Sequence, residues 1–300
     1  MKTIKVYHVD AFTNQTFGGN AAGVVPDAKD LTNEEMQKIA RELNLSETAF
    51  ILPARNNDAH YRIKYYTPTS EIDFCGHATV ALSWVLGTEF DWKQKTDELR
   101  LETNIGMVPV KWSINNGELE SVIMTQVVPQ VKEFDIRIDE ITRLLGINEK
   151  DLDSQYPIKL AYTGNWHLLV PMKTRKAMDE ALPLIEELGS MNREHFISTT
   201  HLFTFENVDD CELYTRDFAP AVGIAEDPVT GSANGALAGY LVKENIIKLE
   251  ENLQFKIAQG HSVGRPGTLH IFIDQTEQGP IVRVGGQAVI TISGTVFIRN

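Results

Sequence analysis

The chain has 300 residues, of which 42% are hydrophobic and 23% charged, a composition typical of a soluble globular protein. This length suits two domains of ordinary size, each able to bury its own core. The formal net charge is -13 and the pI is near 5.1. Because neutralising phosphates takes clustered Lys and Arg, the composition argues against nucleic-acid binding.

The two cysteines, Cys75 and Cys211, are too few for a disulfide scaffold. They fit a reducing compartment, so we expect a cytoplasmic location. The first ten residues alternate like a strand and lack the continuous apolar core of a signal peptide. No stretch approaches the roughly 18 apolar residues of a membrane-spanning helix, and we expect no membrane partner.

The first part of the chain predicts strands and two helices. Thr32 with Glu35 forms a capping box that starts a helix, and Asn44 ends it in a left-handed cap. Residues 76–86 predict a second helix, which is apolar on most faces and therefore buried. Strands are predicted at 3–12, 45–52, 61–66, 99–103, 107–112 and 121–127, the last after a hairpin turn at 115–117.

The second part follows a similar plan. Helices are predicted at 138–145 and 177–188, and a second buried helix, rich in Ala and Gly, at 232–242. Strands are predicted at 168–171, 202–205, 213–215, 269–273 and 282–298. We place the domains at 1–118 and 119–285, with a C-terminal strand at about 286–300 that is able to return to the first domain. The expected fold class is α+β, with each half a sheet around one apolar helix.

One pattern occurs twice in the chain. Each copy has a Tyr-Thr segment, an acidic residue, a Gly that opens a helix, and the apolar helix itself. The first copy contains Tyr66, Thr67, Asp73 and Gly76, and the second contains Tyr214, Thr215, Asp227 and Gly231. Such a long period is not that of a solenoid. It indicates two related domains that face each other, with a site where the two copies meet.

Glu47 is the first candidate for chemistry. If 45–52 is a strand, Glu47 shares a face with apolar Leu45, Ala49 and Ile51. A carboxylate on an apolar face is desolvated, so its pKa should rise and suit proton exchange near neutral pH. The alternative is a Glu at a helix exit that faces water, and the pattern alone does not decide between them.

The loops before the two apolar helices supply further candidates, Cys75-Gly76-His77 and Thr230-Gly231-Ser232. Free backbone N–H groups and the helix dipole attract an anion at such ends. His77 could donate a hydrogen bond or carry a proton, although a His at a helix start is more often structural. Asp227 could simply cap a turn before Pro228; its counterpart in the first copy, Asp73, makes it more interesting.

The remaining polar positions do not indicate a cofactor or metal site. Gly18-Gly19-Asn20 lacks the spacing of a dinucleotide loop or a P-loop and is better interpreted as a tight turn. No Cys/His cluster has metal-ligand spacing, so no metal is expected. His201 lies in a strand pattern and is expected in the core rather than in catalysis.

Taken together, several motifs resemble the PhzF family, the phenazine biosynthesis-like proteins. The resemblance runs over nearly the whole chain. It is carried by Asp10-Ala11-Phe12-Thr13, Gly18-Gly19-Asn20-Ala21-Ala22-Gly23-Val24, Asn44-Leu45-Ser46-Glu47-Thr48, Cys75-Gly76-His77-Ala78-Thr79, Glu226-Asp227-Pro228-Val229-Thr230-Gly231-Ser232-Ala233 and Gly260-His261-Ser262-Val263-Gly264-Arg265-Pro266-Gly267.

The resemblance implies a diaminopimelate epimerase-like fold. In that fold two pseudo-symmetric halves, each a barrel-like sheet around a central helix, flank an active-site cleft. It also implies a homodimer that uses no cofactor. PhzF itself isomerises a dihydro-hydroxyanthranilate by moving a proton between ring carbons, which suggests a small carboxylate-bearing substrate here. The family's acid/base residue falls on Glu47, and its substrate-holding positions fall on Gly76, His77, Asp227 and Ser232. Trp166 stands where a Pro is expected, which suggests a reshaped pocket wall.

Three other functions can be weighed against this isomerase. A racemase with one thiol per half is disfavoured, because Cys75 aligns with Thr230 and a hydroxyl is a far weaker acid. A Cys75 hydrolase with His77 as base is disfavoured, because side chains two apart at a helix start should point in different directions. A non-catalytic small-acid binder or interaction protein would have no need of Glu47, His77 and Asp227 together.

Overall fold

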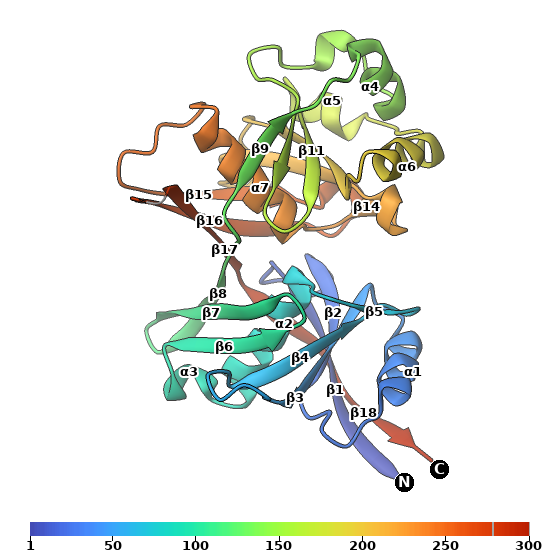
Figure 1. Ribbon diagram of the computed structural model, residues 1–300, viewed down its shortest axis with the longest axis vertical. Coiled ribbons are helices and arrows are strands. Elements are labelled where there is room, and N and C mark those ends of the chain that lie inside the picture. The colour runs from blue at the N-terminus through green and yellow to red at the C-terminus, as the bar shows by residue number, and fades with distance from the viewer. Residues whose placement is uncertain (278, 300) are drawn as a thin grey trace. The chain divides into compact units, whose positions relative to one another are not determined.

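The computed structural model describes residues 1–277 and 279–299, and the chain divides into two compact units. The N-terminal unit comprises Met1–Thr125 with the segment from Gly285 onward, and the C-terminal unit comprises Gln126–Val284. The change of unit falls after β8 (Glu118–Thr125), because β8 pairs along its length with β7 (Gly106–Asn115) of the N-terminal unit. Figure 1 draws the elements of both units.

Strands make up most of the N-terminal unit. Besides β7 and β8 they are β1 (Lys2–Ala11), β2 (Asn20–Val25), β3 (Glu47–Pro53), β4 (Tyr61–Tyr66), β5 (Glu71–Ile72), β6 (Glu98–Thr103) and β18 (Ala288–Ile298). β1 lies antiparallel between β18 and β2, β2 runs parallel to β3, and β3 is antiparallel to β4. β4 then pairs antiparallel with β5 and parallel with β6. The C-terminal strand therefore belongs to this unit.

The helices of this unit are α1 (Asn33–Leu43), α2 (Gly76–Glu89) and the short α3 (Trp92–Lys95). The capping box of Thr32 and Glu35 is present at α1, and Asn44 ends the helix at a φ of 51°. α2 is buried on nearly all faces, as its sequence predicts; its buried residues are His77, Ala78, Thr79, Val80, Ala81, Leu82, Ser83, Val85, Leu86 and Gly87.

The Gly-rich segment before β2 is a tight turn. Gly19 has a φ of +54°, and a Cβ there would lie 2.0 Å from the carbonyl oxygen of Ala11. Only glycine tolerates that backbone and that approach. The turn brings β2 back alongside β1, with Asn20 paired to Ala11.

The C-terminal unit has its own strands and helices. The strands are β9 (Gln130–Glu133), β10 (Lys159–Tyr162), β11 (Trp166–Pro171), β12 (Thr199–Thr204), β13 (Leu213–Phe218), β14 (Glu226–Asp227), β15 (Asn252–Gln259), β16 (Gly267–Thr276) and β17 (Gly279–Gly286), the last two residues of β17 belonging to the N-terminal unit. The helices are α4 (Ile138–Leu145), α5 (Arg175–Asp179), α6 (Ile185–Glu194) and α7 (Gly231–Lys243), with 3-10 turns η1 (Glu149–Asp151), η2 (Pro220–Val222) and η3 (His261–Val263).

Strand pairing shows that the two units share one plan. Five strands of the first unit, β2, β3, β4, β5 and β6, correspond in that order to β11, β12, β13, β14 and β15 of the second. In each set the first strand runs parallel to the second, and the second is antiparallel to the third. The third strand then pairs antiparallel with the fourth and parallel with the fifth. In each unit the apolar helix, α2 or α7, follows the two-residue strand. The α+β fold with two related halves is therefore confirmed.

Two predicted elements are wrong in extent. The helix expected at 177–188 is two helices, α5 and α6, because Pro183 removes a backbone donor and restricts the residue before it. The long strand expected at 282–298 is two strands, β17 and β18, separated at Gln287, whose carbonyl accepts a hydrogen bond from Thr13 instead. Across residues 1–277 and 279–299, no helix combines the length and apolar character needed to cross a membrane.

Candidate active site

Glu47, Cys75 and His77 come together in the N-terminal unit. Glu47 is the first residue of β3, Cys75 is the N-cap of α2, and His77 lies in the first turn of α2. The Oε2 atom of Glu47 lies 3.1 Å from Nε2 of His77, and their side chains are only 20% and 10% exposed. Ser46 Oγ lies 3.4 Å from the same nitrogen. The sequence motifs therefore mark one cluster, although Glu47 is distant from the other two in the chain.

The pKa of Glu47 does not rise as its apolar neighbours suggested. Burial does raise it, but hydrogen bonding and charge from His77, with hydrogen bonds from Ser46 and Cys75, outweigh burial and lower the pKa below its ordinary value. The strand pattern could not show this, because His77 reaches Glu47 from another element. Leu45, moreover, precedes β3 and is not part of the strand face.

His77 and Cys75 influence each other directly. Burial lowers the pKa of His77, but Cys75 and Glu47 outweigh burial and raise it well above its ordinary value. Burial and the nearby Glu47 raise the pKa of the Cys75 thiol. At neutral pH Glu47 is therefore a carboxylate, and Cys75 is a neutral thiol.

The Cys75 thiol and the His77 imidazole are in contact, contrary to the prediction that they point in different directions. Cys75 Sγ lies 3.5 Å from Nδ1 of His77, because Cys75 is the extended N-cap residue, with φ -145° and ψ 119°, and is not yet helical. The raised pKa of the thiol, rather than the geometry, now argues against a cysteine nucleophile.

The same three groups have the spacing of a metal site. Their ligand atoms all lie within 4.8 Å of one another, the single such group of His, Cys, Asp or Glu found among residues 1–277 and 279–299. Sulfur, imidazole and carboxylate are ligands that zinc accepts. The sequence showed no such spacing because Glu47 comes from a separate strand.

The helices α2 and α7 begin alike. Their N-cap residues, Cys75 and Thr230, make no side-chain cap hydrogen bond, and the first turns of both helices contain no acidic residue. An uncapped helix N-terminus presents free N–H groups and positive partial charge. Each unit therefore offers backbone donors to an anion: near Gly76 in the first and near Gly231 and Ser232 in the second.

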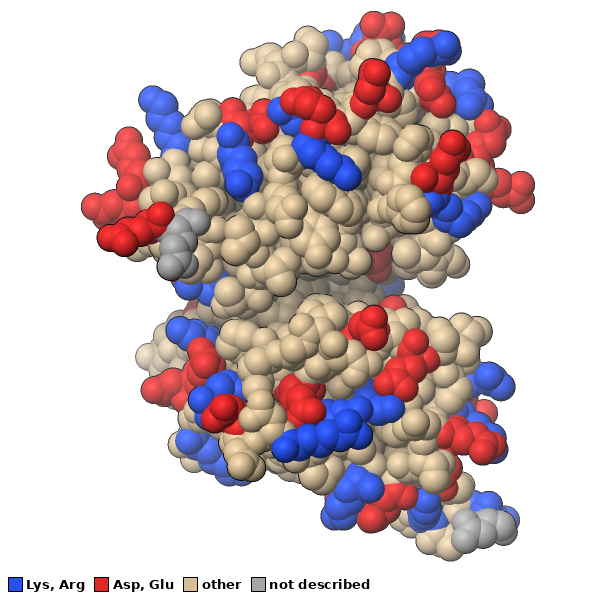
Figure 2. Space-filling view, in the orientation of Figure 1, with Lys and Arg blue, Asp and Glu red and all other residues tan. Residues whose placement is uncertain are grey.

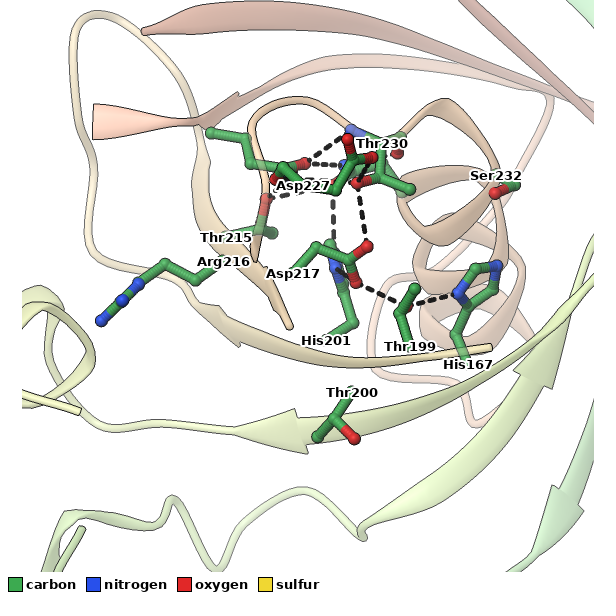
Figure 3. A network of polar contacts seen from close by, with 12 residues as sticks. His167, Thr199, Thr200, His201, Thr215, Arg216, Asp217, Asp227, Thr230 and Ser232 are labelled. Atoms are coloured by element: carbon green, nitrogen blue, oxygen red, sulfur yellow. Dashed lines mark hydrogen bonds and ion pairs between the residues drawn. The ribbon is translucent and has the colours of Figure 1, made fainter. Parts of the chain in front are cut away.

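In the C-terminal unit Asp227 lies in β14, next to the start of α7 (Figure 3). Its Oδ2 atom lies 2.6 Å from the Oγ1 of Thr230. The repeat placed Asp73 opposite Asp227, but strand pairing corrects this. Asp227 pairs with Asp217 on β13, and the corresponding pair in the first unit is Ile72 with Tyr65. Two-residue strands are too short for a sequence pattern to fix their register.

Sequence reasoning missed a buried polar network beside Asp227. Asp217 is 0% exposed and accepts hydrogen bonds from Thr199, His201 and Thr230, at 2.6, 2.9 and 2.9 Å. Thr199 also lies 2.7 Å from Nδ1 of His167. His201 is a core residue, as expected, but one with polar partners. The available signal was the run of polar residues inside strands of the second half, at 199–201 and 215–217.

A model of the phenazine biosynthesis-like protein family matches residues 9–294. The chain belongs to the PhzF family. An uncharacterized isomerase of Clostridium acetobutylicum is 34% identical, with all of both chains covered. Trans-2,3-dihydro-3-hydroxyanthranilate isomerase of Pseudomonas chlororaphis is 33% identical, with 97% of this chain and 98% of that protein covered. The crystal structure of a PhzF-family protein from Bacillus anthracis, 33% identical, superimposes with a TM-score of 0.90 over 99% of this chain and all of that one.

These likenesses confirm the family, the fold and the enzyme class. The PhzF relatives are named isomerases, so the protein is an isomerase. The structure does not support a racemase with one thiol in each half. The N-cap position equivalent to Cys75 is Thr230, and the second cysteine, Cys211, packs in a hydrophobic cluster of the C-terminal unit.

Proposed function

We propose that this PhzF-family isomerase moves a proton within a small carboxylate-bearing molecule, with Glu47 as its one acid/base group. The observation that carries the proposal is the Glu47–His77 contact of 3.1 Å at the start of α2. His77 favours the ionised form of Glu47, which is the form that can accept a proton.

The reaction balances with a single carboxylate. Glu47 takes a proton from one carbon of the substrate, and the electron pair of the broken C–H bond moves into the adjoining π system. Glu47 then returns the proton to another carbon on the same face. No hydride or electron leaves the substrate, so the reaction calls for no cofactor. While Glu47 carries the proton, His77 remains as a positive charge that can stabilise the anionic intermediate.

The substrate class is inferred from the helix ends. Both α2 and α7 present N–H groups without a side-chain cap, an arrangement suited to a carboxylate or an enolate. We assign Gly76, Thr230, Gly231 and Ser232 to substrate binding, with Cys75 as a neutral neighbour and Asp227 as a polar group in contact with substrate. The Pseudomonas relative is named for an anthranilate, which is a carboxylate, and this supports the same class.

The test is proton exchange with solvent. The enzyme is incubated in D₂O with trans-2,3-dihydro-3-hydroxyanthranilate, and with small carboxylic acids chosen because they raise the melting temperature. Mass spectrometry then measures deuterium at carbon. Glu47→Gln should abolish incorporation while the ligand still raises the melting temperature. Glu42→Gln, an exposed Glu on α1, is the matched control and should behave as the unaltered enzyme.

Two results would contradict the proposal. If Glu47→Gln incorporates deuterium at the normal rate, Glu47 is not the proton carrier. If the unaltered protein binds acids but exchanges no proton with any of them, the alternative of a non-catalytic small-acid binder is favoured. The predicted homodimer is a separate proposal, which light scattering of the purified protein tests.

A further inference from the structure

Gln259 lies at the end of β15 and is fully buried, with 0% of its surface exposed. Its backbone pairs with Thr215 of β13 and with Gly267 of β16, so two neighbouring strands fix its position. The next residue, Gly260, has a φ of +88°, and a Cβ there would lie 2.7 Å from the carbonyl oxygen of Pro228. The end of β15 therefore packs against the segment 227–230, which leads from β14 into α7.

The side-chain amide of Gln259 joins the two ends of that segment. Its Oε1 atom accepts from the backbone N–H of Thr230 at 3.1 Å, and its Nε2 atom donates to the carbonyl oxygen of Asp227 at 2.9 Å. A backbone N–H only donates and a carbonyl only accepts, so these two contacts determine which end of the amide is the oxygen. Oε1 also accepts from Nδ2 of Asn234, at 2.7 Å. Gln259 thus ties the segment 227–230 to the first turn of α7.

Gln259 also contacts the hydroxyl of Thr230, the N-cap residue of α7. An N-cap Thr ordinarily accepts a hydrogen bond from a backbone N–H two or three residues further on. Thr230 makes no such bond. Its Oγ1 instead accepts from Nε2 of Gln259 at 3.1 Å, and lies 2.9 and 2.6 Å from carboxyl oxygens of Asp217 and Asp227. The hydroxyl is therefore held in a direction that does not cap the helix.

The first turn of α7 stays open as a result. Its first helical hydrogen bond runs from the backbone N–H of Asn234 to the carbonyl oxygen of Thr230, at 3.2 Å. The N–H groups of Gly231, Ser232 and Ala233 therefore have no partner within the helix. Figure 3 shows Thr230 inside the polar network and Ser232 outside it. Free N–H groups at the positive end of a helix attract an anion.

We propose that Gln259 is a positioning residue. It holds the segment 227–230 and the Thr230 hydroxyl so that the N–H groups at the start of α7 remain free for the carboxylate of the substrate. This inference rests on the proposed function, which assigns Gly231 and Ser232 to substrate binding. Because both ends of its amide are used by the protein, Gln259 acts through these neighbours and not by touching substrate.

The start of α2 needs no such residue. Its N-cap is Cys75, and a thiol is only a weak hydrogen-bond acceptor. The Sγ atom of Cys75 already contacts His77, at 3.5 Å from Nδ1. A hydroxyl that has to be kept from capping the helix is therefore a feature of α7 and not of α2.

The test uses formate, the smallest carboxylate, and requires no turnover. Two-dimensional proton–nitrogen NMR spectra of the full-length protein follow the amides of Gly231, Ser232 and Ala233 as formate is added. We expect saturable shifts in the unaltered protein and about tenfold weaker binding at these amides in Gln259→Met. Methionine is similar in length to glutamine but lacks the amide, so this variant removes the hydrogen bonds while filling the space.

Two controls separate positioning from general loss of stability. The amide of Gly76, at the start of α2, should respond to formate equally in both proteins. Asn192→Leu is the matched variant: Asn192 is also 0% exposed, but its amide accepts from Thr200 and does not contact the segment 227–230. It should bind formate at α7 as the unaltered protein does. Acidic and basic side chains are mixed over the face in Figure 2, so that face has no basic patch to compete for formate.

Equal formate affinity at the α7 amides in the unaltered protein and in Gln259→Met overturns the proposal. So does an unaltered protein whose α7 amides do not respond to formate. A loss that appears equally at Gly76, or equally in Asn192→Leu, shows a general effect on the fold and overturns it as well. If Gln259→Met does not fold, Gln259→Asn takes its place with the same expectation, because its shorter side chain cannot span the segment 227–230.

A kinetic measurement gives the second readout. With a substrate into which the unaltered enzyme introduces deuterium, Gln259→Met should raise KM and leave kcat nearly unchanged, because Glu47 lies in the other unit. A fall in kcat with KM unchanged contradicts a role in holding the substrate carboxylate. If Glu47→Gln leaves deuterium exchange intact, the proposed function fails while the formate result stands. If only the formate result fails, the role of Gln259 is lost and that of Glu47 is not.

Discussion

Glu47 and Thr199 occupy the same position in the two units. Each is the first residue of its strand, β3 or β12, and each pairs with a residue of the parallel strand before it, Ala22 or His167. The duplicated fold therefore carries a carboxylate in one unit and a hydroxyl in the other. A hydroxyl cannot take and return a proton as a carboxylate does, which is in keeping with the proposal of a single acid/base residue.

Thr199→Val should destabilise the C-terminal unit. The hydroxyl accepts from His167 and donates to Asp217, so its removal leaves one buried donor and one buried acceptor each short of a partner. The expected loss is about 1–3 kcal/mol of unfolding free energy. Hydrogen–deuterium exchange of the β12 and β13 amides measures it. Thr199→Ser keeps the hydroxyl and should lose much less; equal losses for Val and Ser would show that packing, not hydrogen bonding, is responsible.

Tyr65 and Thr79 form a buried hydrogen bond beneath the loop that carries Cys75. The two hydroxyl oxygens lie 2.7 Å apart, and Thr79 also donates to the carbonyl oxygen of Cys75 at 2.7 Å. In Tyr65→Phe, Thr79 keeps its hydrogen bond to the carbonyl oxygen of Cys75, so the free energy of unfolding should fall by only about 0.5–1.5 kcal/mol. Thr79→Val leaves the buried Tyr65 hydroxyl without this hydrogen-bond partner, so it should lower the free energy of unfolding by about 1–3 kcal/mol. Urea denaturation of both variants checks the order, and a costlier Tyr65→Phe contradicts it.

The sequence predicted the parts of this protein that depend on local pattern. The capping box at Thr32, the left-handed end at Asn44, the buried helices and the two-part plan all follow from spacing and residue type. The sequence predicted Glu47 and His77 as separate candidates. It did not predict their contact, because the contact joins a strand to a helix. The direction of the Glu47 pKa shift was wrong for that same reason.

Strand register is the second feature that the sequence did not predict. The repeat matched Asp227 with Asp73 because both precede a helix, yet hydrogen bonding pairs Asp227 with Asp217. A side chain buried by tertiary pairing, such as His201 or Asp217, gives a strand pattern no different from that of any polar residue in a core. Their contact depends on the register of β12 with β13, in which His201 and Asp217 are cross-strand partners.

Both cysteines should resist alkylation in the folded protein. Burial, first of all, raises the pKa of each thiol, and the free thiols of Cys75 and Cys211 are 8% and 1% exposed. The thiolate is the reactive form, so labelling by iodoacetamide at neutral pH should be slow until denaturant is added. Mass spectrometry of labelled peptides follows each residue separately. Rapid native labelling of Cys75 would instead indicate a reactive thiol and reopen cysteine chemistry at this site.

The Glu47–His77 pair should stabilise the protein over a defined pH range. The folded pKa of His77 is raised above the ordinary 6.5, so its contribution is complete below about 6.5 and is lost as pH rises through the folded value. The folded pKa of Glu47 is lowered below the ordinary 4.5, so its contribution is present above about 4.5 and is lost as pH falls through the folded value. Both contributions are complete between those two values.

The melting temperature of the unaltered protein should therefore exceed that of Glu47→Gln most between about pH 4.5 and 6.5. The gap should narrow toward alkaline pH, as His77 loses its proton, and again in strong acid, as Glu47 gains one. Differential scanning calorimetry at a series of pH values measures the gap, with the exposed Glu42→Gln as control. A gap that stays constant with pH, or widens toward alkaline pH, would mean that His77 is not charged beside Glu47. The carboxylate would then lack the partner that keeps it ionised and ready to accept a proton.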